Sequence, residues 1–168
     1  MLADGKKMYA YLFEGYWKDV GTIESLWEAN MDLLGRNPAF NLYDKRWRIF
    51  YRNNAEPPHK IGSMGKVVNS MLTEGCVVNG EVVNSVLSNS VKVEEGAYVK
   101  DCVIFGNVTI KKGAKVEYAI IDHDCVIEEN ATVGASREAG NKIAVLGAGY
   151  VVEAGATVEP GAMCEAKK

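Results

Sequence analysis

The sequence has little excess charge, no long hydrophobic run and no Cys-x-x-Cys pair, and each absence excludes a class of protein. Its 168 residues carry a net charge of −3, whereas nucleic-acid-binding domains usually present a basic patch or stripe. No apolar run approaches the roughly 18 residues that mark a membrane-spanning helix. The start, Met1–Lys7, has no hydrophobic signal core. We therefore expect a cytoplasmic protein that binds neither nucleic acid nor membranes.

Cysteine is also scarce, and its placement argues against disulfides and metal sites. The chain has four cysteines and no paired spacing typical of zinc or redox motifs. Cys76 and Cys125 fall at a position of the repeat described below that Val91 and Val108 occupy elsewhere. We expect both to be buried, reduced thiols that serve as small apolar residues.

A seventeen-residue repeat runs through the middle of the chain and predicts its architecture. Because strand residues two apart share a face, each short run of the repeat places one small and one aliphatic side chain inward. Three such runs make one coil, so the period predicts a mainly β fold, a parallel β-helix of hexapeptide type. The aliphatic columns are Val93, Ile110 and Ile127; Val99, Val116 and Val133; and Ile104 with Ile121, and the small column is Ala97, Ala114 and Ala131.

The repeat is imperfect at both ends. Leu72 and Leu87 match at a spacing of fifteen, which predicts a shorter first coil. The pattern breaks at 134–144, where we expect a loop that protrudes from one corner, and it resumes at Leu146. We assign residues 63–168 to the β-helix domain.

The chain before the repeats has a different organisation. Apolar residues recur at three-to-four spacing over 22–34, which predicts an amphipathic helix capped by Thr22 and stopped at Gly35. Residues 8–13 and 16–20 are expected to be strands. Two strands make no stable sheet by themselves, so residues 1–35 are expected to be an α/β remnant of a larger domain, with Tyr16 and Trp17 in its core. Residues 36–62, with their prolines, are the linker and junction segment.

The stretch Glu14-Gly-Tyr-Trp-Lys-Asp-Val-Gly-Thr22, continuing to Leu33, resembles the sugar nucleotidyltransferases, among them the bacterial glucose-1-phosphate adenylyltransferases (ADP-glucose pyrophosphorylases). In that family such a block closes the catalytic domain, and a helix, a Pro-rich linker and a left-handed β-helix follow, in the order found here. The resemblance implies left-handed coils. It also implies the parent reaction of glycogen biosynthesis, in which ATP and glucose 1-phosphate give ADP-glucose and diphosphate with Mg²⁺.

The resemblance implies a metal-binding role for one residue and an incomplete active site around it. Asp19 corresponds to the aspartate that helps hold Mg²⁺ between the nucleotide and sugar phosphates, as hard carboxylate oxygens suit that ion. The family's N-terminal Gly-rich nucleotide-binding loop, its second metal-binding Asp and its sugar-phosphate region have no match here. We expect no complete catalytic site, no bound cofactor and no ADP-glucose synthesis from this chain alone. Gly62–Lys66 lacks phosphate-loop spacing and is expected to be a turn.

A basic cluster lies between the predicted helix and the β-helix. Lys45, Arg46, Arg48 and Arg52 accompany a single acid there, with His59 nearby. Guanidinium groups suit phosphate oxygens, and the resemblance implies phosphorylated effectors, such as fructose 1,6-bisphosphate or AMP, at the domain junction. The cluster is therefore a candidate effector anion site, or else a solvated basic face with its aromatic neighbours packed inward. The family also assembles as tetramers, so self-association or pairing with related subunits is expected.

Two other functions stay open. Hexapeptide acyltransferases share the β-helix and use a histidine as general base, and His123 lies on a predicted coil. The repeat places it at a corner where Gly106 stands one coil earlier, so an exposed corner residue is the simpler interpretation. The remaining alternative is a stand-alone structural or regulatory module, since fold by itself does not determine function.

Overall fold

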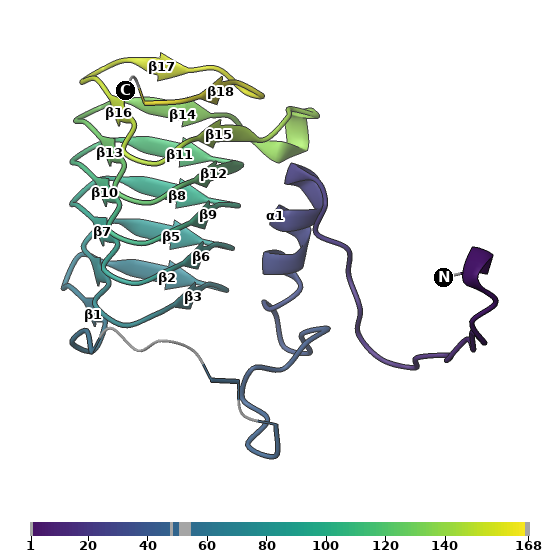
Figure 1. Cartoon of the computed structure of the whole chain (residues 1–168). Coiled ribbons are helices and arrows are strands. Elements are labelled where there is room, and N and C mark those ends of the chain that lie inside the picture. Colours follow the sequence, from purple (N-terminus) through teal and green to yellow (C-terminus); the bar gives the residue numbers. More distant parts are fainter. Residues whose placement is uncertain (1, 48, 51–54, 167–168) are drawn as a thin grey trace.

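The computed structural model describes residues 2–47, 49–50 and 55–166. Three six-stranded parallel sheets form a left-handed parallel β-helix of about six turns (Figure 1). Sheet A contains β1 (Lys60–Ile61), β4 (Val77–Val78), β7 (Lys92–Val93), β10 (Thr109–Ile110), β13 (Val126–Ile127) and β16 (Val151–Val152). Sheet B contains β2 (Lys66–Val68), β5 (Glu81–Val83), β8 (Tyr98–Lys100), β11 (Lys115–Glu117), β14 (Thr132–Gly134) and β17 (Thr157–Val158). Sheet C contains β3 (Met71–Leu72), β6 (Val86–Leu87), β9 (Val103–Ile104), β12 (Ala119–Ile121), β15 (Ala144–Leu146) and β18 (Met163–Cys164).

The strand register confirms the seventeen-residue period. Ile110 pairs with Val93 on one side and with Ile127 on the other, so residues seventeen apart stack directly. The fifteen-residue spacing arises between β4 and β5, where the corner has only two residues, 79–80, against four at 94–97. The shortened corner is not in the first turn of the β-helix, because β1 begins at Lys60 and precedes it.

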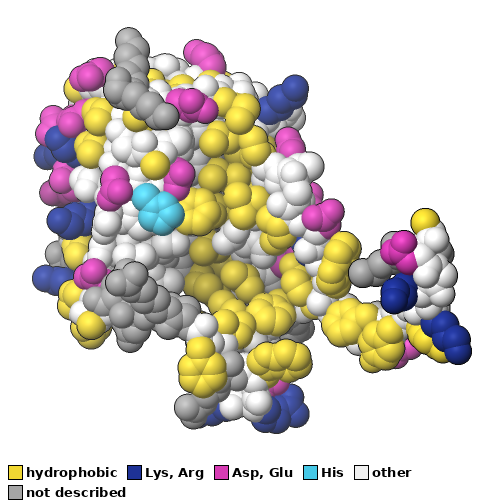
Figure 2. Space-filling model, viewed as in Figure 1, with side chains coloured by type: hydrophobic (Ala, Val, Ile, Leu, Met, Phe, Trp, Pro, Cys, Tyr) yellow, Lys and Arg dark blue, Asp and Glu magenta, His cyan; other side chains and the backbone are white. Residues whose placement is uncertain are grey.

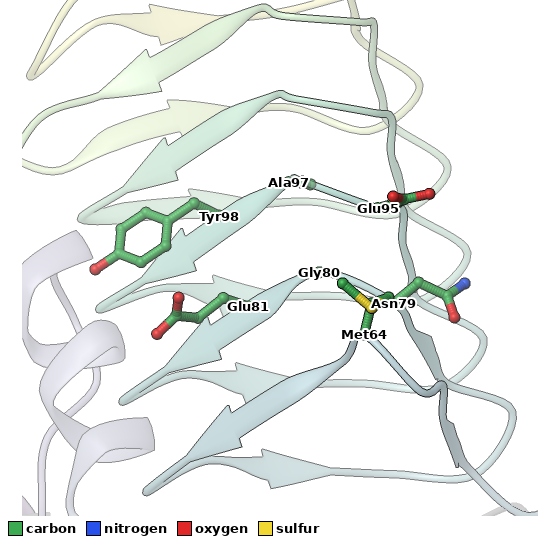
Figure 3. Close-up of a pocket in the computed structure, with 8 residues that line it drawn as sticks. Met64, Asn79, Gly80, Glu81, Glu95, Ala97 and Tyr98 are labelled. Carbon is green, nitrogen blue, oxygen red and sulfur yellow. The ribbon is translucent and has the colours of Figure 1, made fainter.

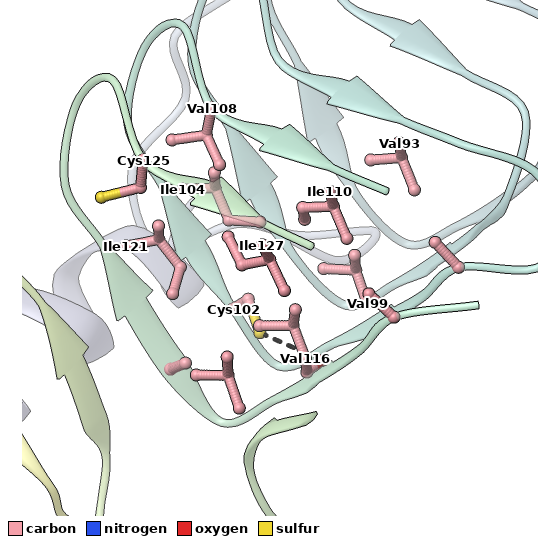
Figure 4. Close-up of a cluster of buried hydrophobic side chains, with 14 of the residues drawn as sticks. Val93, Val99, Cys102, Ile104, Val108, Ile110, Val116, Ile121, Cys125 and Ile127 are labelled. Carbon is pink, nitrogen blue, oxygen red and sulfur yellow. Dashed lines mark hydrogen bonds between the residues drawn. The ribbon is translucent and has the colours of Figure 1, made fainter. Parts of the chain in front are cut away.

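The core lies inside the coils and consists of the predicted columns (Figure 4). Ile104, Ile110, Ile121 and Ile127 are all fully buried. Burial of each such side chain contributes roughly 1.5–3 kcal/mol, so stacking of coils supplies the main stabilisation of the fold.

In the first four coils, the corner between sheets B and C has one residue with a left-handed backbone. Asn69, Asn84 and Asp101 have φ values of 44°, 47° and 55°. Asn and Asp tolerate this conformation because their short polar side chains can hydrogen-bond locally. Here they bond to one another: Asn69 Nδ2 donates to Asn84 Oδ1 over 2.8 Å, and Asn84 Nδ2 donates to Asp101 Oδ1 over 2.5 Å. This ladder holds successive coils in register.

One α-helix, α1 (Ile23–Met31), lies alongside sheet C, and a short 3-10 turn, η1 (Leu2–Asp4), stands near the N-terminus (Figure 1). Thr22 caps α1 as predicted: its hydroxyl accepts from the Ser25 amide over 3.1 Å, and the Ser25 hydroxyl accepts from the Thr22 amide. The helix ends at Met31 rather than at residue 34, because the next turn tightens to i→i+3 bonds before Gly35. No helix in the described part of the chain is long and apolar enough to cross a membrane.

The prediction of strands at residues 8–13 and 16–20 is wrong. Neither segment belongs to a β-strand in the described structure, in which the first strand is β1. Tyr9 and Tyr11 are each 88% exposed. Strands need a hydrogen-bonded partner and a covered face, and the described part of the chain gives these segments neither. Tyr16 and Trp17 consequently lie at the surface rather than in a core, with 38% and 74% exposure.

Candidate functional site

The helix α1 is docked on the outer face of sheet C through Trp27. This indole is 3% exposed and forms a cluster with Val103, Ile120 and Ile143. Its Nε1 donates to the main-chain carbonyl of Asp101 over 2.7 Å. Apolar side chains gather over the face where the helix meets the β-helix (Figure 2). The docking places α1 on the outside of the coils, against sheet C.

The segment that precedes α1 is tied to that helix by a small polar network. Lys18 Nζ lies 2.9 Å from Asp32 Oδ2 and 3.2 Å from Glu28 Oε2, and the Tyr16 hydroxyl donates to Asp32 Oδ2 over 3.0 Å. The hydrogen bond from Lys18 lowers the pKa of Asp32, and the same bond raises the pKa of Lys18. Residues 16–18 are therefore held against the helix although they form no strand.

Asp19, the predicted magnesium ligand, follows this network directly. It is exposed and stands three residues before the helix cap. Among the described residues, no three His, Cys, Asp or Glu side chains lie close enough together to hold a metal ion. A lone carboxylate still suits Mg²⁺, which takes one or two protein carboxylates and completes its shell with water and phosphate oxygens. Asp19 fits as one donor of a shared site and does not form a site by itself.

The structure places the described part of the basic cluster at the surface. Arg48 and Arg52, and the neighbouring Tyr51, lie outside the described residues. Arg46 is paired with Asp44 through two bonds, Nε to Oδ1 over 3.0 Å and Nη2 to Oδ2 over 2.9 Å. The bonds from Arg46 lower the pKa of Asp44 to about 2.

A shallow hollow of about 320 Å³ lies beside this pair. Lys45 lines it together with apolar side chains, whereas His59 is exposed further along the chain. Trp47 and Phe50 are 81% and 88% exposed, so the expectation that the aromatic neighbours pack inward is wrong for these two. The other lining residues are Leu42, Tyr43, Asp44, Ile49 and Phe50.

His123 lies at an exposed corner of the β-helix, as the repeat predicts. Its Nδ1 is 2.6 Å from Asp122 Oδ1, and its ring stacks on Phe105 with centroids 5.3 Å apart. The imidazole is thus packed against its own coil. This arrangement suits a corner residue that links adjacent coils.

A second hollow, of about 370 Å³, opens at the shortened corner between β4 and β5 (Figure 3). Gly80 is required there, because a Cβ at this position would come within 2.4 Å of the Ala97 carbonyl oxygen. Glu81 lines the hollow and is ion-paired with Lys66 over 2.7 Å. Residues 62–65 form the turn between β1 and β2 and Lys66 begins β2, so the prediction of a turn at Gly62–Lys66 is confirmed for all but its last residue.

All four cysteines are free thiols, and three are buried. Cys76 and Cys125 point into the coils at the predicted repeat position, where both are fully buried. Burial also raises the pKa of Cys102 to about 12, so this thiol stays protonated at neutral pH. The expectation of buried, reduced cysteines is confirmed for Cys76 and Cys125.

The contacts around Trp27 were not predicted from the sequence. The spacing of apolar residues indicated that Trp27 faces a core, but nothing in it named Asp101, Tyr118 or Arg137 as partners. Arg137 lies in the predicted break of the repeat, where only a protruding loop was expected. The sequence feature that could have indicated the contact of Arg137 with Trp27 is the position of that break, which falls at the corner between sheets B and C next to α1.

Comparison with known families matches both parts of the chain. A family described as "GlmU-like, C-terminal hexapeptide" matches residues 57–158, more than half of the chain. A family described as "Nucleotidyl transferase" matches residues 1–36, which include Asp19 and α1. The two matches follow the same order as the extended segment with its helix and the β-helix.

Similar proteins carry the name glucose-1-phosphate adenylyltransferase. The one from Clostridium perfringens (strain 13 / Type A) is 51% identical over 152 residues, which cover 90% of this chain and 38% of the relative. The one from Bacillus mycoides (strain KBAB4) is 53% identical over 112 residues, which cover 67% of this chain and 30% of the relative. The chain therefore spans well under half of the length of the relatives it matches.

Proposed function

The chain belongs to the family described as GlmU-like, C-terminal hexapeptide, and from this membership we propose that it is the C-terminal regulatory and assembly part of a glucose-1-phosphate adenylyltransferase. The observation that carries the proposal is the 51% identity to such an enzyme along 152 residues, through α1 and the coils alike. The parent reaction joins ATP and glucose 1-phosphate to give ADP-glucose and diphosphate.

Within this proposal, Asp19 contributes one carboxylate to a magnesium site shared with the substrates and with the remainder of the enzyme. The bound metal would polarise the attacked phosphate and offset charge in the displacement. The chain's own part is to hold that carboxylate. The Lys18–Asp32 bond and the Thr22 cap fix the backbone on either side of Asp19, so its position follows that of α1. Pre-organisation of this kind favours catalysis because the ligand needs no rearrangement when substrate binds.

The 168 residues by themselves are proposed to be catalytically inactive. A single exposed carboxylate leaves the transferred phosphates without the several donors that phosphoryl transfer requires. The test is diphosphate release by the purified chain with Mg²⁺, ATP and glucose 1-phosphate. We expect none above the blank, and turnover that Asp19→Asn abolishes would overturn the proposal of inactivity.

The β-helix is proposed to serve assembly and control. Among the described residues β18 lies at the edge of sheet C, and Met163 on this strand is 70% exposed. Exposed strand edges and apolar side chains favour association with another chain. We propose a homo- or hetero-oligomer, a tetramer in the assembled enzyme, and light scattering after size-exclusion chromatography tests it. A strictly monomeric chain at about 100 µM, well above typical oligomer dissociation constants, would contradict self-association.

A regulatory anion site at Lys45, Arg46, Arg48 and Arg52 is the finer part of the proposal. The support is the open hollow beside Lys45 and the availability of the Arg46 fork, whose present partner is a single neighbouring carboxylate. A phosphorylated effector would replace Asp44 as the partner of Arg46, since guanidinium binds phosphate in the same bidentate way.

A further inference from the structure

The corner between β14 and β15 is much longer than the same corner in the other coils. Nine residues, 135–143, connect these strands, whereas Tyr118 alone connects β11 and β12. The added residues contain a 3-10 turn, η2 (Arg137–Ala139), which Gly140 closes in the left-handed conformation. The loop projects beside α1 rather than into solvent away from the helix (Figure 1).

The loop covers the side of Trp27 that the β-helix leaves open. The guanidinium carbon of Arg137 lies 4.8 Å from the centroid of the Trp27 ring, at cation–π distance. Ile143, at the end of the loop, is 5% exposed and belongs to the same apolar cluster. On the β-helix side, Tyr118 meets the indole edge-on at 5.1 Å, and the Asp101 carbonyl accepts its N–H. Trp27 is thus enclosed between a rigid coil and a separate loop.

The loop is anchored by contacts that can open reversibly. Lys100 Nζ lies 3.1 Å from Glu138 Oε1, and the Glu138 side chain is 81% exposed. Asn141 Nδ2 donates to the Ser136 carbonyl over 2.9 Å, which holds the loop together internally. Exposed ion pairs and cation–π contacts are individually weak, so the part of the loop that carries Arg137 and Glu138 can leave Trp27 while Ile143 stays packed against the coils.

We propose that residues 135–143 form a clamp that controls the docking of α1 on the β-helix. When the clamp is closed over Trp27, α1 is held beside sheet C, and the segment that carries Asp19 follows the helix to which it is bonded. When it opens, the helix loses its outer contact and moves away from the coils more readily. The clamp therefore sets how firmly α1, and with it the preceding segment, is held on the β-helix. This inference goes beyond the proposed function, because it depends on no substrate and on no reaction.

The test is amide hydrogen exchange on the full chain, with Arg137→Ala compared with the unmodified protein. We expect the peptide that covers α1 to exchange about two- to fivefold faster, the factor that corresponds to one exposed cation–π contact. Exchange in β7–β12 should stay unchanged, because coils stack independently of the loop. Lys112→Ala is the matched control: it removes one exposed positive charge from another corner and should change neither region.

A second variant tests the clamp without reliance on one side chain. Replacement of residues 135–143 by a single Asn gives this corner the one-residue length found at Tyr118, and it should accelerate exchange of α1 further. In a Trp17→Phe, Trp47→Phe background, acrylamide should quench the fluorescence of Trp27 more strongly in both clamp variants. Unchanged α1 exchange in both variants would overturn the proposal. Equal acceleration throughout the β-helix would also overturn it, because the loop would then stabilise the coils and not the helix.

Discussion

The indole N–H of Trp27 and the main-chain carbonyl of Asp101 are hydrogen-bonded over 2.7 Å, although 74 positions separate them in the sequence. Asp101 has a φ of 55°, and its carbonyl faces α1 at the corner between sheets B and C. The bond thus joins the one α-helix of the described structure to the middle of the β-helix. A left-handed corner, required by the coil, also supplies the acceptor that docks the helix.

Trp27→Phe should lower the free energy of unfolding by about 1–3 kcal/mol, because the buried Asp101 carbonyl loses its donor and the smaller ring leaves a gap. A urea titration followed by circular dichroism measures this. Trp47→Phe is the matched control, since Trp47 is 81% exposed, and it should stay within about 0.5 kcal/mol of the unmodified protein. Equal effects of the two substitutions would contradict the assigned role of Trp27.

Asn84→Ala should destabilise the chain by about 2–3 kcal/mol for two reasons. It removes two hydrogen bonds of the ladder, and it leaves alanine, whose side chain cannot form hydrogen bonds, in a left-handed conformation with a φ of 47°. Asn84→Gly removes the same bonds but tolerates the backbone conformation. It should therefore be less harmful than Asn84→Ala by about 1 kcal/mol. Thermal unfolding of both variants checks the order, and a more stable Ala variant would disprove backbone strain at this corner.

Ile110→Ala should cost about 2–5 kcal/mol, because this fully buried side chain sits between Val93 and Ile127 and leaves a cavity when shortened. Val151→Ala, on the outer face of β16 and 45% exposed, serves as the control. Its effect should remain below about 0.5 kcal/mol. Denaturant titrations of both variants distinguish inward from outward positions, and similar losses would contradict the assigned faces.

The contact between Lys18 and Asp32 should depend on pH at both extremes. The folded-state pKa of Asp32 lies below its ordinary value, so its stabilising effect is present above that value and is lost as acid protonates the carboxylate. The folded-state pKa of Lys18 is raised, so its contribution is present below the ordinary lysine value and is lost at more alkaline pH. Residues 16–18 should stay docked on α1 near neutral pH and come loose in acid.

Proton NMR of the Tyr16 ring follows this loosening directly, because its hydroxyl donates to Asp32. Lys18→Met should show the released spectrum already at pH 7. If the Tyr16 signals of that variant match those of the unmodified protein at pH 7, the network does not hold the segment.

If the basic cluster binds effectors, an Arg46→Ala, Arg48→Ala double variant should bind AMP or fructose 1,6-bisphosphate at least tenfold more weakly. The reason is that two guanidinium groups that donate hydrogen bonds to phosphate are lost. Asp44→Asn should strengthen binding, since Arg46 would no longer be paired with a carboxylate. Isothermal titration calorimetry measures both affinities, with Lys112→Ala as the charge-matched control. Unchanged affinity in the double variant would remove the cluster as an effector site.

Much of the β-helix was readable from the sequence. Val93, Ile110 and Ile127 stand at one period because each coil contacts only its neighbours, so a residue's environment repeats with the chain. The helix start was equally local, since Thr22 caps α1 through a bond to Ser25, three residues away. Both features can be recognised from the sequence, because the period repeats at a fixed separation and the cap involves residues three apart.

The expected strands at residues 8–13 and 16–20 were wrong for a related reason. Their aromatic residues favour β-strands because they fit the half-buried surface of a sheet, but a strand exists only when another strand pairs with it. The polar network of Tyr16 and Lys18 with Asp32, which does hold the second segment, depends on the direction of α1. No pattern within the segment contains that information.

The sequence by itself thus determined the coils, their inward columns and the cap of α1, because these depend on contacts at short or regularly repeated separations. Only the tertiary structure decided where α1 docks, and that Arg137 lies over the ring of Trp27 while the Asp101 carbonyl accepts the indole N–H. These partners come from loops and corners at irregular separations, and three-dimensional packing alone brings them to one indole ring.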